Sequence, residues 1–306
     1  MVRAHNDNVS VLSLASHVDK EHGLLLASAG ADGVLALWRC ASPGSPLLPL
    51  TRYKLERSPL FSLLSVSDFL LAGTAARDVV RLRWSELARA PPRPRVERAC
   101  AGHTGWVRAL STDGLLVFSV GCNFVRCWDA ETLAPLGQER LFAGDVLALA
   151  SLDGVTYSGG ADGSLRAYAV DAAQRPALKL KQSVDRAHSD RLEALTASSS
   201  KLVSGGRDGA MRVWHPGTLA LAQEVLDAHG AGSRVQCLAA SSDGQLLSGG
   251  TDGSVRRWRR VSGSDALEAS GSGDTGSAVR SLLSVSTADG ACCVSGHEDG
   301  KLRVWV

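Results

Sequence analysis

The stretch LVSGGRDGAMRVW, Leu202–Trp214, decides the fold of this chain. It holds two short runs with strand character, Leu202–Ser204 and Met211–Trp214, on either side of Asp208-Gly209. Asp-Gly between two such runs is a strong hairpin signal, because a tight two-residue turn needs positive φ at its centre. An isolated hairpin is only marginally stable in water. The stretch must therefore belong to a larger sheet structure.

The same pattern recurs along the whole chain of 306 residues. The other copies are SAGADGVLALW (Ser28–Trp38), TAARDVVRLRW (Thr74–Trp84), SVGCNFVRCW (Ser119–Trp128), SGGADGSLRAY (Ser158–Tyr168), SGGTDGSVRRW (Ser248–Trp258) and SGHEDGKLRVW (Ser295–Trp305). Their terminal aromatic residues lie 46, 44, 40, 46, 44 and 47 residues apart. A period of this length indicates a repeat architecture, in which each unit buries its apolar faces against its neighbours.

The repeat resembles the WD40 family, in which each unit forms a four-stranded blade of a β-propeller. Four units also place a histidine before the first apolar run, at His5, His103, His188 and His229, although only Trp128-Asp129 keeps the literal Trp-Asp pair. The resemblance implies an all-β, seven-bladed WD40-type propeller. We expect it to occupy residues 1–306 as a single domain, with units that end at Trp38, Trp84, Trp128, Tyr168, Trp214, Trp258 and Trp305.

The closing blade is expected to lack a full outer strand. In the family this strand follows the terminal aromatic residue, but one residue follows Trp305, and Met1–Ala4 alone precede His5. At ~3.3 Å per residue, four residues supply about three ladder positions. Three explanations stay open: the sequence is a fragment, the propeller tolerates a thin blade, or a partner strand completes it.

Histidine, serine and aspartate recur together, which admits a hydrolytic triad as one interpretation. The resemblance implies instead a hydrogen-bonded set with the tryptophan, which satisfies buried polar groups and clamps each blade. Repetition favours the clamp, because an active site has no need of several copies. The implied sets are His5/Ser28/Asp32/Trp38, His188/Ser204/Asp208/Trp214 and His229/Ser248/Asp252/Trp258, with His103/Ser119/Asn123/Trp128 as a weakened version.

Composition argues against several other classes of function. The net charge is +2, which leaves no electrostatic footprint for nucleic acid, and no apolar run reaches the roughly 18–20 residues that span a bilayer. The seven cysteines include no CxxC pair, so we expect reduced thiols and a cytoplasmic or nuclear location. We predict no catalytic residue, metal, cofactor or small-molecule substrate. The histidines that could be considered as metal ligands have simpler interpretations: His17 and His22 indicate a solvated loop, and His297 lies in a hairpin.

Five units have an arginine two residues before the aromatic residue: Arg126, Arg166, Arg212, Arg256 and Arg303. One interpretation is a basic stripe for nucleic acid. The alternative is a side chain whose stem covers a neighbouring blade while its guanidinium reaches water or a carboxylate, which the balanced net charge favours.

Partners of WD40 propellers usually bind the face with the hairpin turns. The side chains expected there flank the first residue of each inner strand or precede the turn aspartate. Arginines cluster at these positions in the third and the fifth to seventh units. The first unit has the small, neutral residues Asn8 and Ser10 there, and the second unit does not align. The candidates are Trp106, Arg108, Arg191, Glu193, Arg207, Arg234, Gln236, Arg280 and Glu298. One hypothesis is that arginine forks around a Trp106 anchor bind an acidic or phosphorylated peptide. The alternative is that the arginines only keep the rim soluble.

The sequence thus predicts a non-catalytic protein–protein interaction scaffold or adaptor. The first alternative is a substrate-recognition subunit of a ubiquitin ligase. The cullin-4 type of receptor usually carries an arginine two residues past Trp-Asp, whereas Trp128-Asp129 is followed by Ala130-Glu131. A propeller enzyme and a nucleic-acid binder are the remaining alternatives.

Overall fold

The computed structural model describes residues 1–6, 8–42, 45–89, 94–99, 102–140, 144–171, 177–198, 201–241, 244–261, 266–287 and 290–305. The described residues form seven four-stranded sheets, numbered here in chain order. The chain divides into two compact units, Met1–Leu110 with Arg280–Val306 (unit 1) and Ser111–Val279 (unit 2), and each is described by itself.

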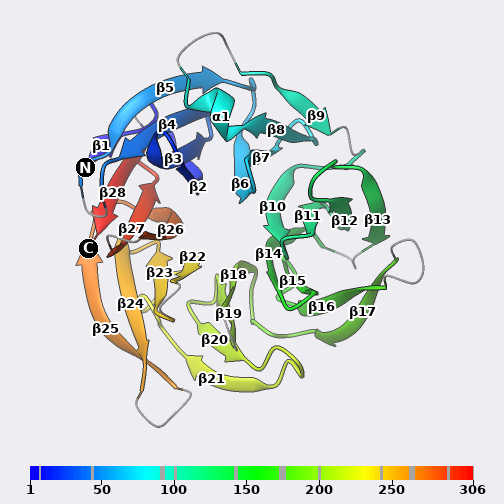
Figure 1. Ribbon diagram of the computed structural model, residues 1–306. Coiled ribbons are helices and arrows are strands. Elements are labelled where there is room, and N and C mark those ends of the chain that lie inside the picture. The colour runs from blue at the N-terminus through cyan, green and yellow to red at the C-terminus, as the bar shows by residue number, and fades with distance from the viewer. Residues whose placement is uncertain are drawn as a thin grey trace. The chain divides into compact units, whose positions relative to one another are not determined.

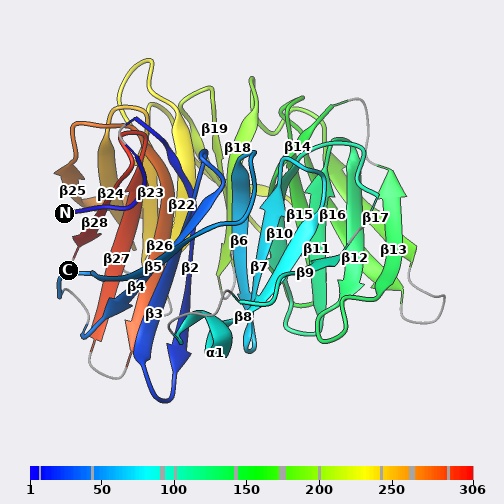
Figure 2. The same ribbon diagram turned by 90° about the horizontal axis from the view of Figure 1, so that it is seen from above.

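Unit 1 holds the first, second and seventh sheets (Figure 1). In order of pairing they are β2 (Val11–Asp19), β3 (Gly23–Gly30), β4 (Val34–Cys40) and β5 (Leu48–Lys54); β6 (Leu60–Val66), β7 (Phe69–Thr74), β8 (Val79–Arg83) and β9 (Glu97–Ala99); and β26 (Val279–Thr287), β27 (Gly290–His297), β28 (Lys301–Trp305) and β1 (Val2–Arg3). The helix α1 (Trp84–Leu87) follows β8, and Figure 2 shows it beside the hairpin between β2 and β3.

Unit 2 holds the third to sixth sheets, except that residues 107–110, at the start of the third sheet, belong to unit 1. These sheets have the same order of four strands. They are β10 (Val107–Thr112), β11 (Leu116–Gly121), β12 (Phe124–Asp129) and β13 (Pro135–Arg140); β14 (Val146–Leu152), β15 (Val155–Gly160), β16 (Leu165–Asp171) and β17 (Ala177–Val184); β18 (Leu192–Ser198), β19 (Lys201–Gly206), β20 (Met211–Trp214) and β21 (Leu221–Val225); and β22 (Val235–Ala240), β23 (Leu246–Gly250), β24 (Ser254–Arg260) and β25 (Leu267–Asp274).

The first residue of each first strand is a buried anchor with a fixed register. Leu192 pairs with Gly206 and Val235 pairs with Gly250, and both anchors are 0% exposed. A β-bulge follows each pair, which adds a residue to the first strand and redirects the next side chain. This end of each sheet also carries the turn between the second and third strands. We call it the Asp-Gly end, and the opposite end the far end.

The Asp-Gly turns need glycine for two reasons. Gly163 has φ +76°, a conformation that strains any residue with a Cβ atom. A Cβ added there would also lie 2.3 Å from the backbone oxygen of His188, on the chain that leads into the next sheet. The turn therefore fits against its neighbour only when the side chain is absent.

The core consists of apolar clusters that join neighbouring sheets. In unit 1, one cluster includes Leu25 and Leu37 of the first sheet with Leu60 and Leu82 of the second. In unit 2, Val203 and Val213 of the fifth sheet pack with Leu246 of the sixth. Full burial of each such side chain stabilises the fold by about 1.5–3 kcal/mol.

The seventh sheet confirms the expectation of an incomplete outer strand. Its fourth strand, β1, has two residues, with Val2 opposite Leu302 and Arg3 opposite Lys301. The fourth strands of the first and fifth sheets have seven and five residues. That the seven repeats form one domain over residues 1–306 stays a prediction, because the two units are described separately.

The assignment of His17 to a solvated loop is wrong, because His17 lies in β2 and is half-buried. Two further sequence expectations about unit 1 are wrong. The anchor of the first strand is Val11, which pairs with Gly30, rather than Val9, so the flanking residues are Ser10 and Leu12 instead of Asn8 and Ser10. Alternating apolar residues allow either register, and the bulge after Val11 hides the correct one.

Trp84 is the other correction, because it begins α1 instead of ending a third strand. Its Nε1–H donates to Ser65 Oγ of the first strand of its sheet at 3.0 Å. Its ring stacks on His17 of the first sheet with centroids 5.4 Å apart.

The turn geometry leads to a stability prediction. Gly163→Ala should lower the free energy of unfolding by about 2 kcal/mol, because it combines positive φ with a backbone clash. Gly217→Ala is the matched control, since a Cβ there meets nothing within 4 Å. Urea denaturation checks both. Equal midpoints for the two variants would contradict the role assigned to Gly163.

Candidate partner-binding site

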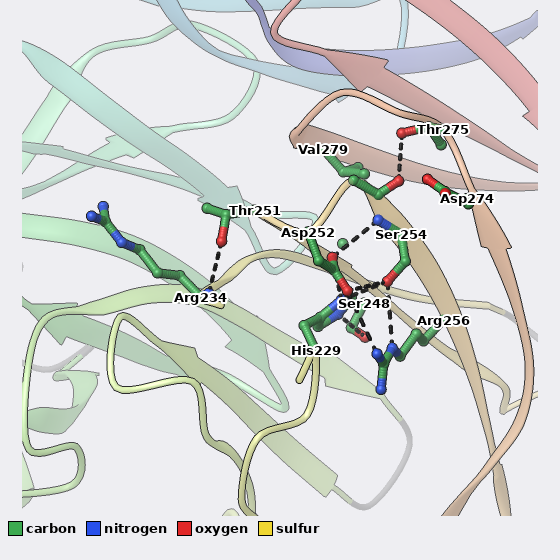
Figure 3. Close-up of polar contacts among 12 residues, drawn as sticks. His229, Arg234, Ser248, Thr251, Asp252, Ser254, Arg256, Asp274, Thr275 and Val279 are labelled. Carbon is green, nitrogen blue, oxygen red and sulfur yellow. Dashed lines mark hydrogen bonds and ion pairs between the residues drawn. The ribbon is translucent and has the colours of Figure 1, made fainter. Parts of the chain in front are cut away.

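Each clamp of the first, fifth and sixth sheets centres on a buried serine hydroxyl. In the sixth sheet, Trp258 Nε1–H donates to Ser248 Oγ at 2.8 Å. His229 Nε2 lies 2.7 Å from the same oxygen (Figure 3). His229 Nδ1 lies 3.0 Å from Asp252 Oδ1 in the turn. The pairing implies a directed chain in which the indole donates to serine, serine to imidazole and imidazole to carboxylate.

The structure brings the other two complete sets together in the same way. His5 lies 3.2 Å from Ser28 and 3.0 Å from Asp32, and Trp38 donates to Ser28 at 3.2 Å. His188 lies 2.7 Å from Ser204 and 2.9 Å from Asp208, and Trp214 donates to Ser204 at 2.8 Å. Each serine is 0% exposed and contacts both an indole and an imidazole. This geometry leaves no access for a substrate and favours the structural role.

The weakened fourth set is divided between the two units. His103 is buried in unit 1, whereas Ser119, Asn123 and Trp128 belong to unit 2. Within unit 2, Trp128 Nε1–H donates to Ser119 Oγ at 2.8 Å, and Asn123 is half-buried. The contribution of His103 to this set stays a prediction.

The arginines of the third strands contact the turn carboxylates. Arg212 Nη1 lies 2.9 Å from Asp208 Oδ2, and its Nε donates to Glu224 Oε1 at 2.7 Å. Arg166 lies 3.3 Å from Asp162, and Arg256 lies 3.5 Å from Asp252. In these three sheets the guanidinium group reaches a carboxylate. This agrees with the second interpretation of these arginines and not with a basic stripe for nucleic acid.

His297 belongs to a fourth clamp that the sequence analysis missed. Its Nε2 lies 2.7 Å from Ser295 Oγ, to which Trp305 Nε1–H donates at 2.8 Å. The imidazole comes from the end of the second strand, where the first, fifth and sixth sheets have Gly30, Gly206 and Gly250. The sequence contains a signal for this clamp. The seventh copy reads SGH where the most regular copies read SGG, and it has no histidine before its first apolar run.

Available space explains this exchange of positions. A Cβ added to Gly206 would lie 2.3 Å from His188 Nδ1, and one added to Gly30 would lie 2.3 Å from His5 Nδ1. Glycine at the end of the second strand thus makes room for a histidine from the preceding loop. In the seventh sheet His297, which is 0% exposed, stands at that position itself.

The clamps shift the pKa values of their titratable groups. Burial lowers the pKa of His5 and His229, although Asp32 and Asp252 oppose that shift. Burial would raise the pKa of Asp208, but hydrogen bonds from His188 and Arg212 hold it well below its ordinary value. Neutral imidazoles and charged carboxylates are therefore the forms that the folded state favours.

Trp106 forms an aromatic cluster in unit 1 and is 50% exposed. Its ring stacks on Phe61 with centroids 5.4 Å apart, and the Arg108 guanidinium lies 4.9 Å from the Trp106 ring and 5.2 Å from the Phe61 ring. Phe61 was missed because the second unit could not be aligned. The structure pairs Leu60 with Thr74 and thereby places Phe61 directly after the anchor.

Arg280 and Glu298 form an ion pair elsewhere in unit 1. Arg280 Nη2 lies 3.0 Å from Glu298 Oε1, with side chains 35% and 52% exposed. Exposed pairs of this kind contribute only about 0–1 kcal/mol. A carboxylate from another molecule can therefore compete for this arginine.

The remaining candidates lie at the Asp-Gly ends of the fifth and sixth sheets in unit 2. Arg207 donates its backbone N–H to the carbonyl of Arg191 at 2.8 Å, and its Nε lies 3.5 Å from Asp190 Oδ2. Arg234 donates its backbone N–H to Thr251 Oγ1 at 3.0 Å, and Figure 3 shows its side chain pointing away from the His229 clamp. Glu193 and Gln236 are half-buried. Since Trp106 and Arg108 belong to unit 1, a joint surface of all these residues stays a prediction.

Comparison with known proteins defines the class. The WD domain, G-beta repeat model matches residues 95–129, 222–259 and 267–306. The crystal structure of the WD40 β-propeller domain of Doa1 resembles the chain with a TM-score of 0.79 and 18% identity, over 100% of this chain and 95% of that one. The chain thus matches the WD repeat in three places and has the fold of a seven-bladed β-propeller, as the sequence predicted.

Two further proteins are similar to the chain. The computationally designed Ika8 protein matches with a TM-score of 0.67 and 20% identity, over 99% of this chain and 98% of that one. The human kinesin-like protein KIF21A is 27% identical over 126 residues, which are 40% of this chain and 8% of that protein. The match thus spans a small part of the curated relative.

Metal-binding clusters and membrane-spanning helices are both absent from the described residues. They contain no group of three or more His, Cys, Asp or Glu side chains placed to hold a metal ion. Among the same residues, no helix has the length and apolar character needed to cross a membrane.

Acid should destabilise the protein in two stages. The unfolded histidines bind protons below a pKa of 6.5, but the folded pKa of His5 and His229 is lower. Stability is therefore full above this pH and falls below it, by at most about 1.4 kcal/mol per pH unit for each histidine. The lowered carboxylate pKa values of Asp208 and Asp252 predict a second loss below about pH 3.8. Urea midpoints from pH 7.5 to pH 3 check this.

His229→Gln is the informative variant for the first stage. It should lower stability at pH 7.5 and show a shallower decline toward pH 5, because one group with a lowered pKa is gone. His215→Gln is a control at a histidine outside the clamps. An unchanged slope in His229→Gln would contradict the assignment.

His297→Ala should lower the free energy of unfolding by about 1–3 kcal/mol, because the buried Ser295 hydroxyl loses its imidazole partner. His215→Ala is the control, because it removes an exposed imidazole outside the clamps. Urea denaturation measures both, and a change below about 0.5 kcal/mol in His297→Ala would refute the fourth clamp.

Proposed function

We propose that this protein is a non-catalytic adaptor that binds acidic segments of other proteins at the Asp-Gly ends of its sheets. WD40 propellers commonly serve as protein-interaction scaffolds, which supports the general role. The observation that carries the proposal is the exposed stack of Trp106 on Phe61, with Arg108 against both rings. A cytoplasmic or nuclear location is part of the same proposal.

The aromatic cluster has the chemistry of a binding hot spot. Tryptophan and arginine are enriched among residues that dominate interface energies, and half of the Trp106 surface is open to contact. The two rings attract the Arg108 guanidinium by about 0.5–2 kcal/mol. Arg108 is thereby held in place before a partner arrives, which lowers the entropy that binding has to remove.

Arginines at the Asp-Gly ends of other sheets also favour an acidic partner. The Arg207–Asp190 and Arg280–Glu298 pairs are exposed and weak, so a partner's carboxylate or phosphate can replace the internal one. The side chains of Arg191 and Arg234 form no ion pair with any described residue. Arginine binds carboxylate and phosphate through two parallel N–H donors, which gives both affinity and direction.

The ubiquitin-ligase alternative has no support among the described contacts. Asp129 of the single Trp-Asp pair accepts from the backbone N–H of Thr132 at 2.7 Å and from its hydroxyl at 2.7 Å. It caps its own turn, which is a local structural role. An enzymatic role lacks an accessible nucleophile in the complete clamps, because their serines are buried.

Peptide binding to the full chain tests the proposal. We would measure 12-residue peptides with alternating glutamate, with phosphoserine in its place, and with glutamine as the neutral counterpart. Glutamate and phosphoserine peptides should bind and glutamine peptides should not, and higher salt should weaken binding because it screens exposed charges. Equal binding of all three would overturn the acidic specificity.

Trp106→Ala should weaken that binding by at least tenfold and Arg108→Gln by about threefold to tenfold, as expected for a hot spot and an exposed charge. Leu115→Ala and Leu226→Ala are matched controls, because both residues are exposed apolar side chains outside the cluster. If Trp106→Ala binds acidic peptides as tightly as the unchanged chain, the site lies elsewhere.

A further inference from the structure

A cavity of about 270 Å³ lies between the fifth and sixth sheets of unit 2, at their far ends. Its floor is apolar and consists of Val203, Leu246 and Leu267, which are 4%, 4% and 7% exposed. These three residues also belong to the apolar cluster that joins the two sheets. The cavity is therefore an opening into the core between the two sheets.

The charged side chains that line this cavity are both cationic. Lys201, at the start of β19, and Arg260, at the end of β24, line it together with Thr196, Ser198 and Gln245. Among the described lining residues there is no aspartate or glutamate. An apolar floor beneath two cationic side chains suits an occupant that is apolar at one end and anionic at the other.

A double hydrogen bond holds one wall of the cavity in place. The side-chain amide of Gln223, on β21 of the fifth sheet, donates to the carbonyl of Leu267 at 2.9 Å. Its oxygen accepts from the N–H of Leu267 at 2.6 Å. Leu267 begins β25 of the sixth sheet, so the amide ties the two sheets together beside the cavity. A wall fixed in this way favours binding without rearrangement.

The volume limits the size of the occupant. The volume of about 270 Å³ lies just below the roughly 300–1,000 Å³ typical of small-molecule sites. One large apolar side chain with an adjacent charged group matches this volume better than a drug-sized ligand.

We propose that this cavity docks a peptide segment of another protein, which inserts a leucine-like side chain while a neighbouring carboxylate meets Lys201 and Arg260. The proposal does not depend on the Trp106 cluster, which lies in the other unit. A chain with both sites would hold two partners at once, which is what an adaptor requires.

Methyl NMR of the full chain, labelled at leucine and valine, tests this proposal with capped dipeptides. Acetyl-Leu-Glu-amide should shift the methyl signals of Val203, Leu246 and Leu267. Acetyl-Leu-Gln-amide should bind about threefold to tenfold more weakly because it lacks the charge. Acetyl-Ala-Glu-amide should bind at least tenfold more weakly because it lacks most of the apolar side chain.

Variants separate the cavity from a general effect of charge. The double variant Lys201→Gln/Arg260→Gln should remove the preference for glutamate over glutamine and leave binding of the glutamine dipeptide unchanged. Lys181→Gln, an exposed lysine of β17 outside the cavity, should keep the preference. Trp106→Ala should also leave this binding unchanged, so failure here and failure of the acidic-peptide site are distinguishable. Absence of shifts at the three floor residues, or equal binding of all three dipeptides, would overturn the proposal.

Discussion

The hydrogen bond from a buried indole N–H to a buried serine hydroxyl is the interaction on which the sheets depend. It occurs in the first, third, fifth, sixth and seventh sheets at 2.8–3.2 Å. An unsatisfied buried donor costs about 1–3 kcal/mol, so the indole can stay in the core only where the hydroxyl is present. The hydroxyl in turn needs an acceptor, which the imidazole supplies, and the imidazole connects the core to the turn. The clamp therefore couples apolar packing inside the sheet to the conformation of the turn at its end.

The same coupling prepares the surface for binding. The buried anchor residues and the short turns between the second and third strands fix the backbone from which the candidate side chains project. Trp106, Phe61 and Arg108 are adjacent because two anchors, Leu60 and Val107, are both 0% exposed. A rigid scaffold beneath a few exposed aromatic and cationic side chains is an arrangement that suits recognition of a peptide.

Much of this structure could be predicted from the sequence, because seven copies of one pattern correct one another's ambiguities. The turns, the order of strands and the short outer strand of the seventh sheet all follow from the alignment of copies. The failures occur where one copy departs from the pattern. Val9 and Val11 fit an alternating strand equally well, and only the bulge decides between them. Phe61 lies in the second copy, which has no preceding histidine and does not align with the others. His297 was overlooked because its unit has no histidine before the first strand, and a missing residue gives no signal in the sequence. The space that either histidine can fill is visible only in the structure.

The alternative position of the histidine also constrains the order in which these repeats diverged. A Cβ at Gly206 would overlap the imidazole of His188, so one sheet cannot hold both histidines. A repeat of the common type can therefore become one like the seventh sheet only by losing the first histidine before it gains the second. The fourth sheet corresponds to such an intermediate: residues 104–187 contain no histidine, Gly160 is retained, and Arg166 donates to Ser164 at 2.6 Å beside the turn. Within one sheet the two positions of the clamp histidine are thus mutually exclusive.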